Sequence, residues 1–283
     1  MLYLIIVSLI WAFSFGLIKT NLTSIDSNLV ALFRLFISFI VFLPFLKIKN
    51  LSTKEQIIFI SIGTIQYGFM YIAYIYAFQF LKSYEVALFT IFTPIFITFY
   101  NDLIKKKFHA KFLIVAVAAV LGAGIVIFKD LSSENIWLGF ILMQISNICF
   151  AVGQVWYSNV MNGKKEYDNK SIFALLYLGA VIVAFISTMF SVNIGDIQIT
   201  GEQAITLVYL GAVSSGLAFF LWNVGATKVN KGTLAIFNNL KIPAAILVSV
   251  LIFGESGDIT RLIIGGGIIL TALFLNESKT VKS

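Results

Sequence analysis

An apolar run from about Leu234 to Phe253 contains the segment Phe237-Asn238-Asn239-Leu240-Lys241-Ile242-Pro243. The run is long enough for a helix that spans a membrane. Lys241 would then lie near the middle of the bilayer, where an unpaired cation is costly and usually serves a function. We therefore expect Lys241, Asn238 and Asn239 to form the positive part of a site for a small anionic molecule. The alternative is a lysine that snorkels or bonds to nearby carbonyls.

The composition of the whole chain is typical of a membrane protein. Of its 283 residues, 59% are hydrophobic and 12% are charged, with a mean hydropathy of +0.97, whereas soluble domains average about 25% charged residues. A net charge of +7 would suggest a nucleic-acid partner in a soluble protein. Here the lysines cluster in short loops, so we expect a lipid bilayer as the partner and no nucleic acid. The single cysteine excludes an intrachain disulfide.

Ten segments are apolar and long enough, at about 20 residues each, to cross a bilayer. They are residues 2–18, 28–46, 56–80, 84–103, 111–128, 136–158, 171–190, 204–224, 233–253 and 260–276. The connections between them are short and leave no room for a soluble domain. The N-terminus has no basic region and no cleavage site, so the first helix is expected to stay. The sequence predicts an all-α polytopic membrane protein with ten transmembrane helices.

The positions of the basic residues indicate the orientation of these helices. With the N-terminus inside, fourteen of the 20 Lys and Arg residues lie in inner loops. The outer loops hold only Lys19, Lys82, Lys129 and Arg261, and Arg34 and Lys241 lie within the membrane. This imbalance satisfies the positive-inside rule. We therefore expect both termini in the cytoplasm. We also expect the protein to lie in a bacterial inner (plasma) membrane.

Two prolines indicate a repeat within the ten segments. Pro94 lies in the fourth segment and Pro243 in the ninth, which is the fourth helix of each group of five. Because five is odd, the second group enters the membrane from the opposite side. Proline-interrupted helices at matching positions of inverted repeats point to the binding site. We therefore expect a 5+5 inverted-topology repeat with helix breaks at Pro94 and Pro243; a kink that serves packing alone is the alternative.

Several short motifs resemble the EamA domain of the drug/metabolite transporter superfamily. They are Trp11-Ala12-Phe13-Ser14-Phe15, Ala31-Leu32-Phe33-Arg34-Leu35, the stretch from Tyr209 to Ala218 with Trp222, and Pro243 followed by Gly254-Glu255. The resemblance covers nearly the whole chain as two repeats, 1–130 and 131–283. It implies a ten-helix carrier of metabolites. Lys241 is not part of the general family motif, so it is informative about the cargo.

Helical spacing groups the remaining polar residues into faces. Trp11 and Ser14 share a face of the first helix, and Tyr67, Tyr71 and Tyr74 form a stripe on the third. Asn147 and Gln154 lie on roughly one face of the sixth helix. A polar side chain facing lipid would lack a partner, so these faces are expected to turn inward. Inward residues either contact the cargo or only bond across helices.

Arg34 lies about a third of the way into the second helix from its outer end. Its planar fork of donors suits a carboxylate. A structural or gating role is the equal alternative, because the family pattern places an arginine here broadly.

The sequence therefore predicts a secondary transporter that works by alternating access. Its expected cargo is a small polar metabolite, an amino acid or an organic carboxylate, bound between the repeats. An exporter of hydrophobic drugs, amines or lipid-like metabolites is the alternative. A membrane-embedded enzyme is disfavoured because one histidine and one cysteine offer no catalytic pair. No cofactor and no metal site are expected, and the chain is expected to act as a monomer or homodimer.

Overall fold

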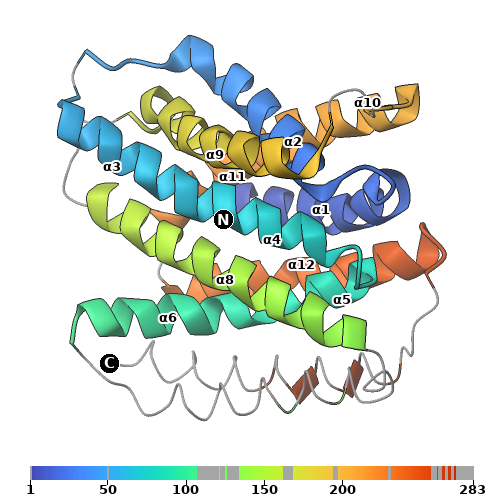
Figure 1. Cartoon of the computed structure of the whole chain (residues 1–283). Coiled ribbons are helices and arrows are strands. Elements are labelled where there is room, and N and C mark those ends of the chain that lie inside the picture. Colours follow the sequence, from blue (N-terminus) through green and yellow to red (C-terminus); the bar gives the residue numbers. More distant parts are fainter. Residues whose placement is uncertain are drawn as a thin grey trace.

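The computed structural model of the chain describes residues 2–49, 51–106, 134–161, 168–193, 197–228 and 231–255, with the single positions 121, 125, 260, 263, 264, 267, 268 and 271. Across these residues all regular elements are helices (Figure 1). In the described part, seven helical stretches are long and apolar enough to cross a membrane. The expected segments 111–128 and 260–276 lie outside the continuous described ranges.

The first part of the chain forms four long helical stretches. They are α1 (Leu2–Leu17) with the π-helical η1 (Ile18–Leu22); α2 (Ser27–Phe42) with η2 (Leu43–Phe45); α3 (Thr53–Gly63), η3 (Thr64–Phe69) and α4 (Met70–Ala77); and α5 (Ser83–Phe89), η4 (Thr90–Phe92) and α6 (Thr93–Ile104). Each corresponds to one expected segment, with ends that differ by a few residues. Side chains fix several starts, because Asp26 caps α2 and Ser52 forms a capping box with Glu55 at α3.

The second part also forms four long helical stretches in the described residues. It contains α8 (Glu134–Met161); α9 (Asn169–Ser191); α10 (Gly201–Tyr209), η7 (Leu210–Leu217) and α11 (Ala218–Ala226); and α12 (Lys231–Leu251). The third stretch in each part is interrupted by a π-helical segment, η3 in the first and η7 in the second. The motif from Tyr209 to Ala218 therefore coincides with η7.

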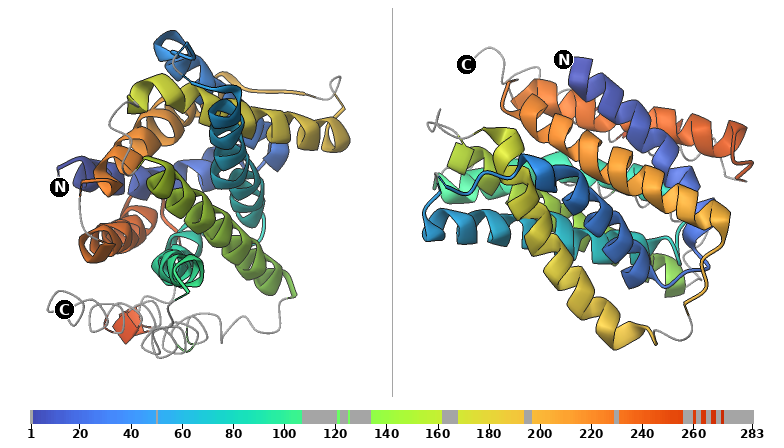
Figure 2. Two further views of the ribbon diagram at one scale, coloured as in Figure 1. Left: turned by 90° about the vertical axis from the view of Figure 1, so that its left-hand side faces the viewer. Right: turned by 90° about the horizontal axis from the view of Figure 1, so that it is seen from above.

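The two parts of the chain pack through matching partners. α1 packs against α12 and α8 packs against α6, while η7 lies on α2 and η3 lies on α9. α2 and α9 also pack directly against each other. The right-hand view of Figure 2 shows α1 (blue) beside the orange and red helices α11 and α12. Each part therefore completes the packing of the other.

The burial of side chains is that expected of a protein in a lipid bilayer, with polar residues inside and apolar residues on the surface. Ser8, Ser38 and Gln66 are fully buried, whereas Phe190 and Leu251 are 89% and 76% exposed. Polar side chains thus turn to other helices, where hydrogen bonds are available.

Glycines let α3 and α9 approach each other closely. A Cβ atom on Gly63 would lie 1.8 Å from the carbonyl oxygen of Leu176, and one on Gly179 would lie 2.0 Å from that of Ile60. Each glycine therefore admits a backbone oxygen of the facing helix. This crossing leaves no room for a larger side chain at either position.

The two prolines have different surroundings. At Pro94 the helix is interrupted, because the 3-10 turn η4 separates α5 from α6 and the proline stands in the first turn of α6. At Pro243 the expected break is absent, because α12 continues through it from Lys231 to Leu251. A proline inside a helix removes one backbone donor and bends the helix without having to end it. The matched prolines therefore do not produce matched breaks.

Glu255, from the second part of the chain, caps a helix of the first part. Its two carboxylate oxygens each accept from the backbone nitrogen of Ser83 at 3.1 Å, at the start of α5. The Ser83 hydroxyl also lies 2.6 Å from that of Ser249 on α12. Gly254, with a φ of 65°, lets the chain turn after α12 so that Glu255 reaches this position.

We expect Glu255→Ala to reduce stability by about 1 kcal/mol, the usual effect of removing a helix cap. A melting curve of the purified protein in detergent would show a lower melting temperature. Glu202→Ala is the matched control, because Glu202 is exposed in the first turn of α10 and caps nothing. Equal melting temperatures for the Glu255 variant and the unmodified protein would contradict the capping role.

Candidate binding site

A pocket lies between helices from both parts of the chain. It contains about 560 Å³ of space free of protein atoms, part of which is open to the surroundings. Its apolar lining comprises Trp11, Phe15, Met70, Tyr71, Tyr74, Met143, Phe150 and Phe219. Its other lining residues are Ser14, Arg34, Thr90, Thr93, Ser146, Asn147, Ser214 and Lys241. Among the described residues, this lining contains two cations and no carboxylate.

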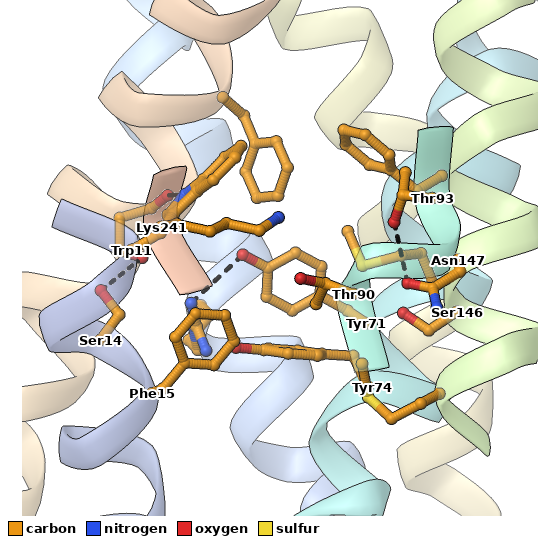
Figure 3. A pocket seen from close by; sticks show the side chains of 16 residues that line it. Trp11, Ser14, Phe15, Tyr71, Tyr74, Thr90, Thr93, Ser146, Asn147 and Lys241 are labelled. Atoms are coloured by element: carbon orange, nitrogen blue, oxygen red, sulfur yellow. Dashed lines mark hydrogen bonds between the residues drawn. The ribbon is translucent and has the colours of Figure 1, made fainter. Parts of the chain in front are cut away.

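Lys241 reaches into the pocket from α12, on the same side as Trp11 and across from Thr93 and Asn147 (Figure 3). Its Nζ donates to Asn238 Oδ1 at 3.1 Å and lies 5.0 Å from the centre of the Trp11 ring. The lysine is 7% exposed, and no carboxylate in the described residues pairs with it. Because an ammonium carries three donors, part of its hydrogen-bonding capacity faces the pocket unused.

Trp11 is itself fixed by the second part of the chain. Its Nε1 donates to the backbone oxygen of Ser214 at 3.1 Å, and the Ser14 and Ser214 hydroxyl oxygens lie 2.9 Å apart, within hydrogen-bond distance. The indole therefore presents its face to the lysine, which is the favourable geometry for a cation.

Arg34 is held at another edge of the pocket. Its Nε donates to Ser215 Oγ at 3.0 Å and its Nη2 to the Tyr71 hydroxyl at 3.2 Å. Tyr71 in turn donates to Ser215 Oγ at 2.7 Å. The remaining nitrogen, Nη1, is buried and has no partner. An unpaired donor on a buried cation is costly, so an acceptor from a ligand would complete this group.

Asn147 on α8 fills the helix interruption before Pro94. The 3-10 turn directs the Thr93 N–H to the Thr90 carbonyl, so the Phe89 carbonyl lacks its α-helical bond from Thr93 and accepts from Asn147 Nδ2 at 2.8 Å. Thr93 donates its hydroxyl hydrogen to Asn147 Oδ1 at 3.0 Å. Asn147 therefore ties α8 to the α5–α6 break at the pocket wall.

Seven of the residues predicted from the sequence come together around the pocket: Lys241, Arg34, Trp11, Ser14, Tyr71, Tyr74 and Asn147. Tyr67 and Gln154 are buried away from it and bond across helices instead. The Tyr67 hydroxyl accepts from Asn223 at 2.9 Å, and Gln154 accepts from Trp222 at 3.4 Å. Asn238 supports the lysine without lining the pocket. The side chain of Asn239 lies outside the described residues.

Sequence reasoning missed several lining residues, among them Thr90, Thr93 and Ser146. The two threonines stand within one turn of Pro94, the residue expected to mark the site. The helix break was therefore a usable signal for them. Within the described residues, no three His, Cys, Asp or Glu side chains gather as a metal site would require.

Comparison with known proteins relates the chain to transporters. A model of the EamA-like transporter family matches residues 1–128 and 137–277. The biotin transporter of Escherichia coli (strain K12) is 37% identical over 279 residues, which cover 98% of this chain and 93% of that protein. The biotin transporter of Salmonella typhimurium is 36% identical with the same coverage. The probable biotin transporter of Pseudomonas aeruginosa is 35% identical over 282 residues, covering 98% and 97%.

A solved structure titled "Crystal structure of protein" has the same fold. It aligns with a TM-score of 0.68 at 13% identity, over 97% of this chain and 95% of that one. At this identity the likeness concerns the fold alone.

Proposed function

The chain belongs to the EamA-like transporter family and is an integral protein of a bacterial inner membrane, and from this premise we propose that it carries biotin or a closely similar carboxylate. The cargo would bind in the pocket with its carboxylate at Lys241. The observation that carries this proposal is the buried Lys241 ammonium, which faces the pocket without a carboxylate partner in the described part of the chain.

The charge of the pocket supports an anionic cargo. A carboxylate at Lys241 would supply the acceptor that the ammonium lacks, in a site where water is scarce and ionic hydrogen bonds are strong. The free Nη1 of Arg34 offers a second donor. Amines are disfavoured by the same two cations. The amino-acid cargo expected from the sequence has no support from the relatives, whose names specify biotin.

The proposed architecture is ten transmembrane helices in two inverted repeats, 1–130 and 131–283, with both termini in the cytoplasm. Support comes from the matched contacts of α1 with α12 and of α6 with α8, and from the matched π-helical segments. The family model also matches in two successive segments. The pocket is lined by residues from both parts of the chain, as a site for alternating access between two repeats would be.

A transport assay tests this function. The purified protein is reconstituted in liposomes, and we expect radiolabelled biotin to cross the membrane faster than in empty liposomes. Excess unlabelled biotin should compete, whereas biotin amide, which has the same rings but no carboxylate, should compete at least about tenfold more weakly because it forms only neutral hydrogen bonds. A flux equal to that of empty liposomes would overturn the proposal, as would equal competition by the amide.

A further inference from the structure

The wall of the pocket across from Lys241 contains two threonine hydroxyls whose hydrogen bonds differ from those of the lysine. Thr90 and Thr93 lie on this wall, at the interruption between α5 and α6 (Figure 3). Both residues line the pocket, although they are only 7% and 3% exposed. What these hydroxyls can offer a ligand depends on where their hydrogens are directed.

The hydrogen of Thr90 is used within the protein. Its Oγ1 lies 2.7 Å from the backbone oxygen of Ala87. A carbonyl oxygen only accepts, so the hydroxyl must donate here. Toward the pocket, Thr90 has lone pairs and no hydrogen.

The hydrogen of Thr93 is used in the same way. Its partner is Asn147 Oδ1, at 3.0 Å. The orientation of the Asn147 amide is fixed because its other end lies 2.8 Å from the Phe89 carbonyl, which requires the nitrogen there. The Asn147 oxygen must therefore face Thr93, and Thr93 must donate. Toward the pocket, Thr93 also has lone pairs only.

The pocket lining thus contains fixed donors at Lys241 and Arg34 and fixed acceptors at Thr90 and Thr93. Lys241 Nζ and Arg34 Nη1 can only donate, and the Thr90 and Thr93 oxygens can only accept. We infer that the Thr90–Thr93 wall binds a neutral hydrogen-bond donor group of the cargo, such as the N–H groups of a cyclic urea or amide. This inference rests on the proposed function, in which the other end of the cargo is a carboxylate at Lys241. The donor group is neutral because the lining, as far as the structure describes it, holds two cations and no carboxylate.

The inference selects among carboxylates of similar length. Biotin and desthiobiotin carry a carboxylate and a cyclic urea with two N–H groups. Lipoic acid has a carboxylate chain and a ring without N–H or O–H. The acceptor wall gains a hydrogen bond from the first two and none from lipoic acid, and a buried polar group left unpaired disfavours the ligand.

The test compares these acids on the purified full-length protein. Binding of radiolabelled biotin is measured with biotin, desthiobiotin and lipoic acid as competitors. The variants are Thr90→Val, Thr93→Val and Thr93→Ser. Thr98→Val is the matched control, because Thr98 also bonds to its own helix, donating to the Pro94 carbonyl at 2.8 Å, but does not line the pocket.

We expect the unmodified protein and Thr98→Val to bind biotin and desthiobiotin at least about tenfold more tightly than lipoic acid. Each valine variant should reduce this preference roughly 3- to 10-fold, the worth of one hydrogen bond, while lipoic acid binds as tightly as before or more tightly, because valine removes the acceptor that it leaves unpaired. Thr93→Ser should keep the preference. Retained lipoic acid binding also shows that the pocket of a valine variant is intact.

The inference is overturned if lipoic acid binds the unmodified protein as tightly as biotin, or if both valine variants keep the full preference. Failure of the proposed function gives a different result. In that case none of the three acids binds, or biotin amide competes as well as biotin. The role assigned to the Thr90–Thr93 wall would then be rejected together with the proposed function.

Discussion

Lys241→Met is expected to lower the affinity for biotin at least about thirtyfold and to remove measurable transport at micromolar concentrations. Methionine has a similar length and fills the space beside Trp11, so the main loss is the ammonium. Losing one partner of a buried, hydrogen-bonded charge pair costs roughly 2–5 kcal/mol. Lys241→Arg should keep much of the binding, because it keeps the cation at the same wall of the pocket.

The control for this experiment is another lysine beside an aromatic ring. Lys228 Nζ lies 5.5 Å from the centre of the Tyr3 ring, but the lysine is exposed and does not line the pocket. Lys228→Met should leave biotin binding within about twofold of the unmodified protein, since a solvent-exposed lysine outside the pocket contributes little to binding there. Both affinities are read from radiolabelled biotin binding, and transport from proteoliposomes. Full binding by Lys241→Met would remove this residue from the site.

Gly179→Val is expected to prevent the protein from folding. The valine Cβ would lie 2.0 Å from the carbonyl oxygen of Ile60, a backbone atom that cannot move aside as a flexible side chain can. α3 and α9 would have to separate, which would also disturb η3 and the tyrosines that follow it. The destabilisation should exceed about 3 kcal/mol, the upper end for ordinary overpacking. Gly63→Val should behave alike, since its Cβ would lie 1.8 Å from the Leu176 carbonyl oxygen.

Size-exclusion chromatography in detergent measures this effect as the loss of a single, monodisperse peak. Gly201→Val is the matched control, because a Cβ at Gly201 meets nothing within 4 Å. It should elute like the unmodified protein. If Gly179→Val gave the same peak and melting temperature as Gly201→Val, the close crossing of α3 and α9 would not be needed for stability.

The sequence was sufficient to predict the described helices and the two cations that line the pocket. Apolar runs of spanning length correspond to the observed helices because the bilayer imposes that length. Lys241 and Arg34 stood out because a cation in such a run is rare. Trp11 and Ser14 followed from their shared face of the first helix. These residues line one pocket in the structure.

The partners of inward-facing residues were not predictable in the same way. Helical periodicity shows that Tyr67 faces inward, but Asn223 comes from a helix 156 positions later in the chain. Gln154 is likewise bonded to Trp222. Which inward group is satisfied by the protein and which is left for a ligand depends on long-range packing. Packing also determines what Thr90 and Thr93 can offer a ligand. Their hydroxyl hydrogens are donated to the Ala87 carbonyl and to Asn147 Oδ1.

The π-helical segment η3 determines which rings the third stretch presents to the pocket. A π turn holds one residue more than an α turn, and one residue corresponds to about 100° around a helix axis. Without the wider winding at Thr64–Phe69, Tyr71 and Tyr74 would be rotated out of the lining, although their spacing from each other would be unchanged. The direction in which Tyr71 and Tyr74 point is thus set by a segment several residues before them in the chain. A single-residue deletion there would act on cargo recognition at a distance, with every lining side chain still in place in the sequence.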